Sequence, residues 1–241
     1  MSLQALADLR QDFTNGFSVV GLALGGEIQC PTSYESDIRG ASLSLFFDGR
    51  NSVYGVAVSL GIQEIEEVIG LQIALAGSEV RSATGIQIGG LGNVYRSFKG
   101  IQIGGLCNVG GIGETSYGLQ ISGFGNAPSI LGIHGEKLWG PNFVGGQISL
   151  VGNIAEHLKG LQLAAFNDAL RCSGLQIGIR NQAQILEGLQ IGLVNKAEIL
   201  HGLQIGAVNL ARGGAGLQVG LCNAFCQGDN HRILPLVNWR F

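Results

Sequence analysis

The sequence predicts an all-β repeat protein, a parallel β-solenoid of 14–15-residue coils. Three observations carry this prediction: a Gly-aliphatic-Gln-aliphatic motif recurs at short, regular spacing, an asparagine follows each copy, and aliphatic residues alternate with the glutamine. Self-similarity at a short period is the signature of a repeat architecture in which stacked units share one core.

The repeat has two lengths. In the second half of the chain the motif starts every 14 residues, at Gly160, Gly174, Gly188, Gly202 and Gly216, and the matching asparagines are Asn167, Asn181, Asn195, Asn209 and Asn223. The spacing of the earlier glycines is longer by one residue, at Gly40, Gly55, Gly70, Gly85 and Gly100. In the longer units the extra residue lies between Gln and Asn, often as a second glycine, which predicts a bulge or a wider corner.

Within one unit, Leu189 and Ile191 alternate with Gln190, and this period of two is a strand signal. Asn195 then marks a turn, and Ala197 to Leu200 form a second apolar stretch, so we expect two short strands and two corners per coil. Parallel stacking at ~4.8 Å places each residue over its equivalent. We therefore expect isoleucine to pack on isoleucine inside, and amides to bond to the same amide of the next coil.

The alternative is an antiparallel β-barrel of the outer-membrane type, in which Leu and Ile face lipid and Gly and Gln face the lumen. The alternation of Ile233, Pro235, Val237, Trp239 and Phe241 at the C-terminus supports it. Against it, antiparallel strands predict a double period, twice the spacing of the motif, and only the single period is seen. The solenoid is therefore the favoured fold.

Three segments follow from the repeat. Residues 1–15 carry Leu3, Leu6 and Leu9 at helical spacing and are expected to form an N-terminal cap segment. Residues 16–225 form the tandem-repeat β domain, with an irregular insertion at 127–144. Residues 226–241 are expected to be a C-terminal cap strand.

Composition excludes several classes of function. The net charge of −3 and the absence of a basic block argue against a nucleic-acid partner. No run reaches the ~18 apolar residues of a membrane helix. Asp8, Arg10 and Asp12 interrupt the N-terminus, so the sequence as given contains no signal peptide.

The candidate chemistry is sparse. His157 and His201 fall near the ends of coils and are candidates for one column, but zinc needs three or four converging ligands. Cys222, Cys226 and His231 have a loose metal-like spacing, for which one disulfide or two buried thiols is the preferred interpretation. We therefore predict no catalytic, cofactor-binding or metal-binding residues and no cofactor.

The sequence contains an acidic cluster. Glu64, Glu66 and Glu67 lie within one coil. Because no matching acid is expected at an equivalent place in the next coil, the cluster is interpreted as a solvated corner and not as a catalytic carboxylate pair. The chain is accordingly expected not to be an enzyme.

The run GLQIGLVNKAEILHGLQIGAVN (Gly188 to Asn209) resembles the bacterial surface-repeat family known from Leptospira and many Bacteroidetes. The longer units, GIQIGGLGNVYRSFKGIQIGGLCNV, are similar to a second form of that repeat. The resemblance implies an exported or cell-envelope protein, and it brings no catalytic residues. The expected function is a non-enzymatic structural or interaction repeat protein of the envelope or surface, with a protein or envelope component as partner. The alternative is an outer-membrane pore, with membrane association, if the fold is the barrel.

Overall fold

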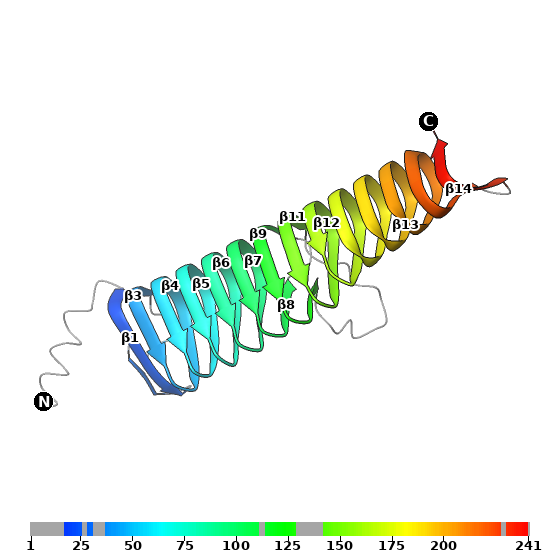
Figure 1. The fold of residues 1–241 in the computed structure, drawn as a ribbon. Helices are drawn as coiled ribbons and strands as arrows, with labels where there is room; N and C mark the ends of the chain where they lie inside the picture. The colour runs from blue at the N-terminus through cyan, green and yellow to red at the C-terminus, as the bar shows by residue number, and fades with distance from the viewer. Residues whose placement is uncertain are drawn as a thin grey trace, which may run out of the picture.

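The protein is an elongated parallel β-solenoid (Figure 1). A computed structural model describes residues 17–25, 28–30, 37–110, 114–128, 142–227 and 230–240. Successive coils stack along one axis, with β1 at one end of the rod and β14 at the other. The expected 1–15 cap segment lies outside the described residues.

The bounds of the strands are β1 Phe17–Gly25, β2 Ile28–Cys30, β3 Asp37–Ser44, β4 Phe47–Ser59, β5 Ile62–Ala74, β6 Gly77–Gly89, β7 Gly92–Gly104, β8 Cys107–Gly110, β9 Thr115–Ser122, β10 Gly125–Pro128, β11 Asn142–Ser149, β12 Gly152–Leu163, β13 Phe166–Gln227 and β14 Asn230–Arg240. Four of the strands, β4 to β7, are 13 residues long, close to the length of one 15-residue repeat, whereas β13 runs through several repeats.

Neighbouring coils pair in parallel, and equivalent residues of the repeat stand opposite one another. Gly70 pairs with Gly85, and Gly85 pairs with Gly100. The register survives the insertion, because Gly118 of β9 pairs with Gly145 of β11. The predicted parallel solenoid is confirmed, and the antiparallel alternative is wrong. Among the described strands, only the pairings of β1 with β2 and of β13 with β14, at the two ends, are antiparallel.

The strands within each coil are longer than the expected two short strands separated by two corners. In the 15-residue coils one long strand is followed by a two-residue bend, as at Leu75–Ala76 between β5 and β6. In the 14-residue coils β13 winds through several turns without a break (Figure 1). The column of repeat glycines helps the chain to turn: Gly100 has a φ of +133°, and a Cβ there would lie 2.0 Å from the Gly85 carbonyl oxygen. Glycine is thus required for its backbone angle and for the close approach of the coils.

The interior is lined by residues other than those expected. Gln190 is fully buried, whereas Leu189 and Ile191 on either side of it point outward and are only partly covered. The expectation that the repeat isoleucines pack inside is therefore wrong. The apolar part of the interior comes instead from the intervening segment, where Ala197 and Leu200 are buried. Alternation in a strand fixes which residues share a face but not which face is inside.

The inward glutamines form one continuous ladder. Nine hydrogen bonds of 2.6–2.9 Å link ten glutamines from Gln72 to Gln218, and each Nε2 donates to the Oε1 of the preceding coil. The predicted glutamine ladder is confirmed, but it lies inside the solenoid. Its two ends, Gln72 Nε2 and Gln218 Oε1, have no hydrogen-bond partner among the described residues.

The asparagines form a second ladder with the opposite polarity. Eight bonds of 2.7–3.2 Å run from Asn93 to Asn223, and each Nδ2 donates to the Oδ1 of the following coil. The second Nδ2 hydrogen of each asparagine donates to a backbone carbonyl of the following coil, as Asn195 does to Ile205 at 2.9 Å. The asparagine column therefore joins the two strand segments on either side of the bend.

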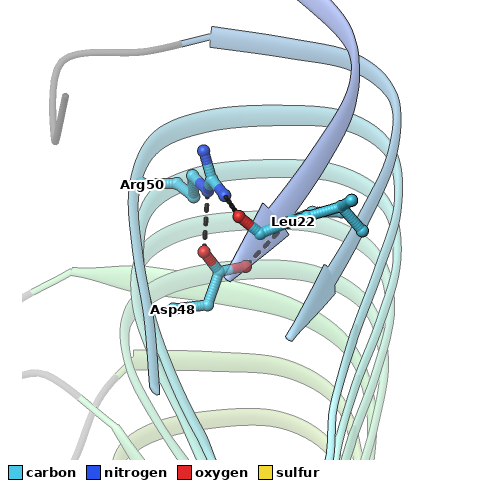
Figure 2. A network of polar contacts seen from close by, with 4 residues as sticks. Leu22, Asp48 and Arg50 are labelled. Atoms are coloured by element: carbon cyan, nitrogen blue, oxygen red, sulfur yellow. Dashed lines mark hydrogen bonds and ion pairs between the residues drawn. The ribbon is translucent and has the colours of Figure 1, made fainter. Parts of the chain in front are cut away.

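At the N-terminal end, a buried ion pair between Asp48 and Arg50 takes the place of the amide ladders (Figure 2). Asp48 stands opposite Gln63 in the asparagine column, and its Oδ1 lies 2.7 Å from Arg50 Nε. Ser42 donates to the other carboxylate oxygen at 2.7 Å, and Arg50 Nη2 donates to the Leu22 carbonyl at 3.3 Å. Both charged side chains are fully buried. Hydrogen bonds to both charges offset part of their desolvation cost, so the network fastens β1 to the first coils.

The other end is covered by β14. Its residues run antiparallel to the last turn of β13, with Leu217 opposite Trp239. Asn238 is buried there, and its Nδ2 donates to the carbonyl oxygens of Asn223 and Arg232, both at 3.1 Å. Within the expected insertion at 127–144, residues 129–141 lie outside the described part of the chain.

The orientation of the strands predicts opposite effects for two acidic substitutions in the same coil. Ile191→Asp places a carboxylate on the outer surface of the coil and should lower the free energy of unfolding of the single chain by less than about 1 kcal/mol. Leu200→Asp buries a carboxylate without a partner and should cost more than about 4 kcal/mol or abolish folding. Urea denaturation followed by circular dichroism measures both. Equal, severe losses would contradict the outward position of Ile191.

The asparagine ladder predicts a defined cost for its loss. Asn195→Ala removes the partners of Asn181 Nδ2 and Asn209 Oδ1, and should cost about 1–3 kcal/mol of stability. Gln184→Ala, a control on an outward position of the preceding coil, should change stability by less than about 0.5 kcal/mol. If Asn181, Asn195 and Asn209 can all become alanine without a loss in urea denaturation, the ladder does not stabilise the fold.

Candidate interaction surface

The outside of the rod has two chemically different sides. We call one the apolar face: it consists of the outward side chains of the segments that follow each repeat glycine, through the next bend. These segments are 41–46, 56–61, 71–76, 86–91, 101–106, 119–124, 146–151, 161–166, 175–180, 189–194, 203–208 and 217–222. The inward positions of these segments hold the glutamine ladder and small residues, so the Leu and Ile residues have no room inside.

The bends are the most exposed part of the apolar face. Leu91, Leu106, Phe124 and Leu150 have 60%, 56%, 63% and 77% of their surface exposed. Backbone bonds between bends, such as Leu106 N to Leu91 O at 2.7 Å, align Leu91, Leu106 and Phe124 in a row along the rod, and Leu150 lies beside Val151, the next residue of that row. Soluble monomers rarely expose contiguous apolar patches beyond a few hundred Å². An apolar row of this length indicates a surface that contacts another apolar surface.

The apolar face is almost without charge. Of the segments that define it, only 175–180 contains a formally charged residue, Arg180. Its Nη2 donates to Gln182 Oε1 at 2.9 Å, beyond the bend and outside the face. Depletion of charge is the compositional mark of an interface centre.

Most charged residues lie on the opposite side, which we call the charged face: it consists of the outward side chains of the segments that lead up to each repeat glycine, such as 62–69, 77–84, 92–99 and 195–201. Arg81 Nη1 lies 2.9 Å from Glu66 Oε2, and Arg212 Nη1 lies 3.2 Å from Glu198 Oε1, each pair linking adjacent coils. These four side chains are all well exposed, so each ion pair contributes little stability. They keep this side of the rod hydrated.

The acidic cluster is dispersed over different partners. Glu66 pairs with Arg81, and Glu67 accepts a hydrogen bond of 2.9 Å from the Tyr54 hydroxyl, which raises the pKa of that tyrosine. The expectation that the next coil holds no equivalent acid is wrong, because Glu64 stands opposite Glu79. Both of these side chains are exposed outward.

In the part of the chain that the structure describes, the histidines and cysteines do not converge. His157 stands opposite Arg171 in the next coil. His201 belongs to a different column, which contains Lys159, Ser173 and Glu187. The expectation that the two histidines share a column is therefore wrong. Within the described residues no group of three His, Cys, Asp or Glu side chains could hold a metal. Cys222 and Cys226 are free, half-buried thiols, which excludes the disulfide.

A shallow groove of about 420 Å³ lies along the bends in the middle of the rod. Phe124 and Phe166 line it on the side of the apolar face, and Asp168 and Arg180 lie at its polar edge. Cys107 also lines the groove, but neither a histidine nor a pair of carboxylates stands beside it there to activate the thiol. The groove is therefore suited to receive an apolar side chain.

Sequence reasoning did not identify this surface, because the repeat isoleucines were placed inside. A signal was nevertheless present: the twelve segments that define the face contain one charged residue, whereas the intervening segments carry most of the others. A solvent-exposed corner normally needs charge, so its absence on one side predicts a contact.

Comparisons with known proteins found no relative of this chain. No family model matches the chain, and neither a curated protein nor a solved structure matches it. In the described part of the chain there is no helix long and apolar enough to cross a membrane.

The buried cysteine gives a pH-dependent prediction. Cys172 lies in the core, and burial raises the pKa of its thiol to about 12. Since the thiolate is the nucleophile, Cys172 should resist iodoacetamide in the folded protein through pH 10 and react after unfolding. Cys107 and Cys222, which are partly exposed, should react in the folded state at pH 8. Peptide mass spectrometry measures the labelling; rapid modification of Cys172 at pH 8 would contradict its burial.

Proposed function

We propose that this chain is a non-enzymatic interaction module of the bacterial cell envelope that binds through its apolar face. The observation that carries the proposal is the row of exposed Leu and Phe side chains along the rod, with Arg180 as the one charge in its segments. Exposed apolar surface of this extent is favourable only when a partner covers it.

The proposal that the chain is not an enzyme rests on the character of its grooves. The groove at the bends is mainly apolar, and a second groove of about 420 Å³ on the charged face is lined by exposed acids and arginines, of which Glu66 and Arg81 form an ion pair. Catalytic groups are usually held in concave, partly desolvated sites. The location in the envelope is supported by the resemblance of the GLQIGLVN-type units to bacterial surface repeats.

The rigidity of the scaffold supports the same role. The two amide ladders and the backbone pairing fix each coil to the next, so the apolar side chains keep a constant spacing along the rod. A preorganised surface loses little conformational entropy on binding. The fold thus presents a long, regular binding surface and leaves the charged face in solvent.

In vivo photo-crosslinking from two positions of one coil tests the role of the face. A benzophenone residue at Leu91, on the apolar face, should give crosslinked products in the envelope fraction of a bacterium that produces the chain. The same residue at Arg96, on the charged face, should give few. Crosslinking only from Arg96, or recovery of the chain outside the envelope fraction, would overturn the proposal.

A further inference from the structure

The apolar face has the properties of a contact between two copies of the chain. We infer that the protein is a homodimer in which the apolar faces of two antiparallel rods pack on each other. This inference rests on the proposed function, because it assigns an occupant to the same surface. Its support comes from area, spacing and charge.

The exposed area is sufficient for a stable dimer. Eleven residues at the bends or at the matching corners of β13 each expose more than half of their surface: Phe46, Leu60, Leu75, Leu91, Leu106, Phe124, Leu150, Phe166, Ile179, Leu193 and Leu221. Together with the half-exposed columns beside them, they present on the order of 1,000 Å² of apolar surface, against about 800 Å² per partner in a standard interface.

The spacing of the face selects a second copy. Backbone bonds link the bends of successive coils between Leu60 and Arg180, so the outward side chains there stand at multiples of the strand separation of ~4.8 Å along the rod. A partner must repeat at the same interval to fit along the whole face. The same face of another copy does so by construction, and two-fold symmetry makes such a contact self-complementary.

Charge selects the orientation of the two rods. The Arg180 guanidinium lies at the edge of the apolar face, where it donates to Gln182. In a parallel pair the two Arg180 residues would lie at the same level of the rods, along an otherwise uncharged interface. In an antiparallel pair the two guanidinium groups lie far apart and face uncharged coils, because Arg180 belongs to the coil of residues 174–187, away from the middle of the rod. The antiparallel arrangement therefore avoids like-charge repulsion.

A lipid surface is a poorer match for the same face. Peripheral proteins that lie on membranes combine an apolar surface with a Lys- and Arg-rich polar side that attracts anionic lipid. Here the net charge is −3, and acids such as Glu64 and Glu79 occupy the charged face together with the bases. Attraction to an anionic bilayer is therefore not expected.

Sedimentation equilibrium of the full chain tests the inference. The protein should be a dimer at micromolar concentration, and Ile179→Lys with Leu193→Lys, at matching corners of adjacent coils of β13, should weaken dimerisation at least a hundredfold. The matched control is Ile185→Lys with Ile199→Lys, on the outward charged face of the same coils, which should remain dimeric. Circular dichroism establishes that both double variants keep the β-sheet signal.

The outcomes are distinct. A monomer at all concentrations, or an undiminished dimer in the apolar-face variant, would overturn the inference. A monomer that floats with phosphatidylethanolamine–phosphatidylglycerol vesicles would assign the face to lipid instead. A monomer with Leu91 crosslinks to other envelope proteins would overturn the dimer but leave the interaction module standing.

The orientation has its own readout. A benzophenone residue at Leu60 should crosslink to partner peptides from residues 189–222 in an antiparallel dimer. Crosslinks to the partner's 56–61 segment would show parallel rods and overturn the antiparallel arrangement.

Discussion

Every coil from Gly85 onward turns one glutamine and one asparagine inward, and each is bonded to the same residue type of an adjacent coil. The rest of the structure depends on these two ladders. A buried primary amide is costly unless its donors and acceptors are paired. Parallel stacking at one coil spacing pairs them all at once, and a slip of one residue would unpair them. The ladders therefore specify the register as well as stabilising it.

The opposite polarity of the ladders has a further consequence. Amide dipoles aligned along a rod would add up, as peptide dipoles do in a helix. Here the Gln Nε2 atoms donate toward the N-terminal end and the Asn Nδ2 atoms toward the C-terminal end, so the two columns oppose each other. The rod can thus grow by whole coils without accumulating a side-chain dipole, and both ladders extend across the shorter and the longer coils alike.

The period, the strand content, the parallel stacking and both ladders could be predicted from the sequence, because each depends only on equivalence between repeats. The inward face could not be chosen correctly, because the alternation Leu189-Gln190-Ile191 is compatible with either choice and the usual preference for buried aliphatic residues favoured the wrong one. The intervening segment held the missing information: Ala197 and Leu200 already supply an apolar interior. The position of Glu64 opposite Glu79 in the neighbouring coil was missed because the early coils match the repeat only weakly in sequence.

In the repeat the glutamines point inward and the aliphatic residues point outward, which is the reverse of the usual strand pattern. This reversal links the fold to the interaction surface. A coil this short encloses only a few side chains, and the amides occupy two of these positions. The aliphatic residues displaced to the outside do not contribute to the folded monomer as a buried core would, yet the repeat retains them in nearly every coil. Serine or threonine in those positions would suit a strand exposed to solvent equally well. Aliphatic side chains there gain free energy only when an apolar partner covers them, so the repeat that specifies the rod also specifies a surface for association.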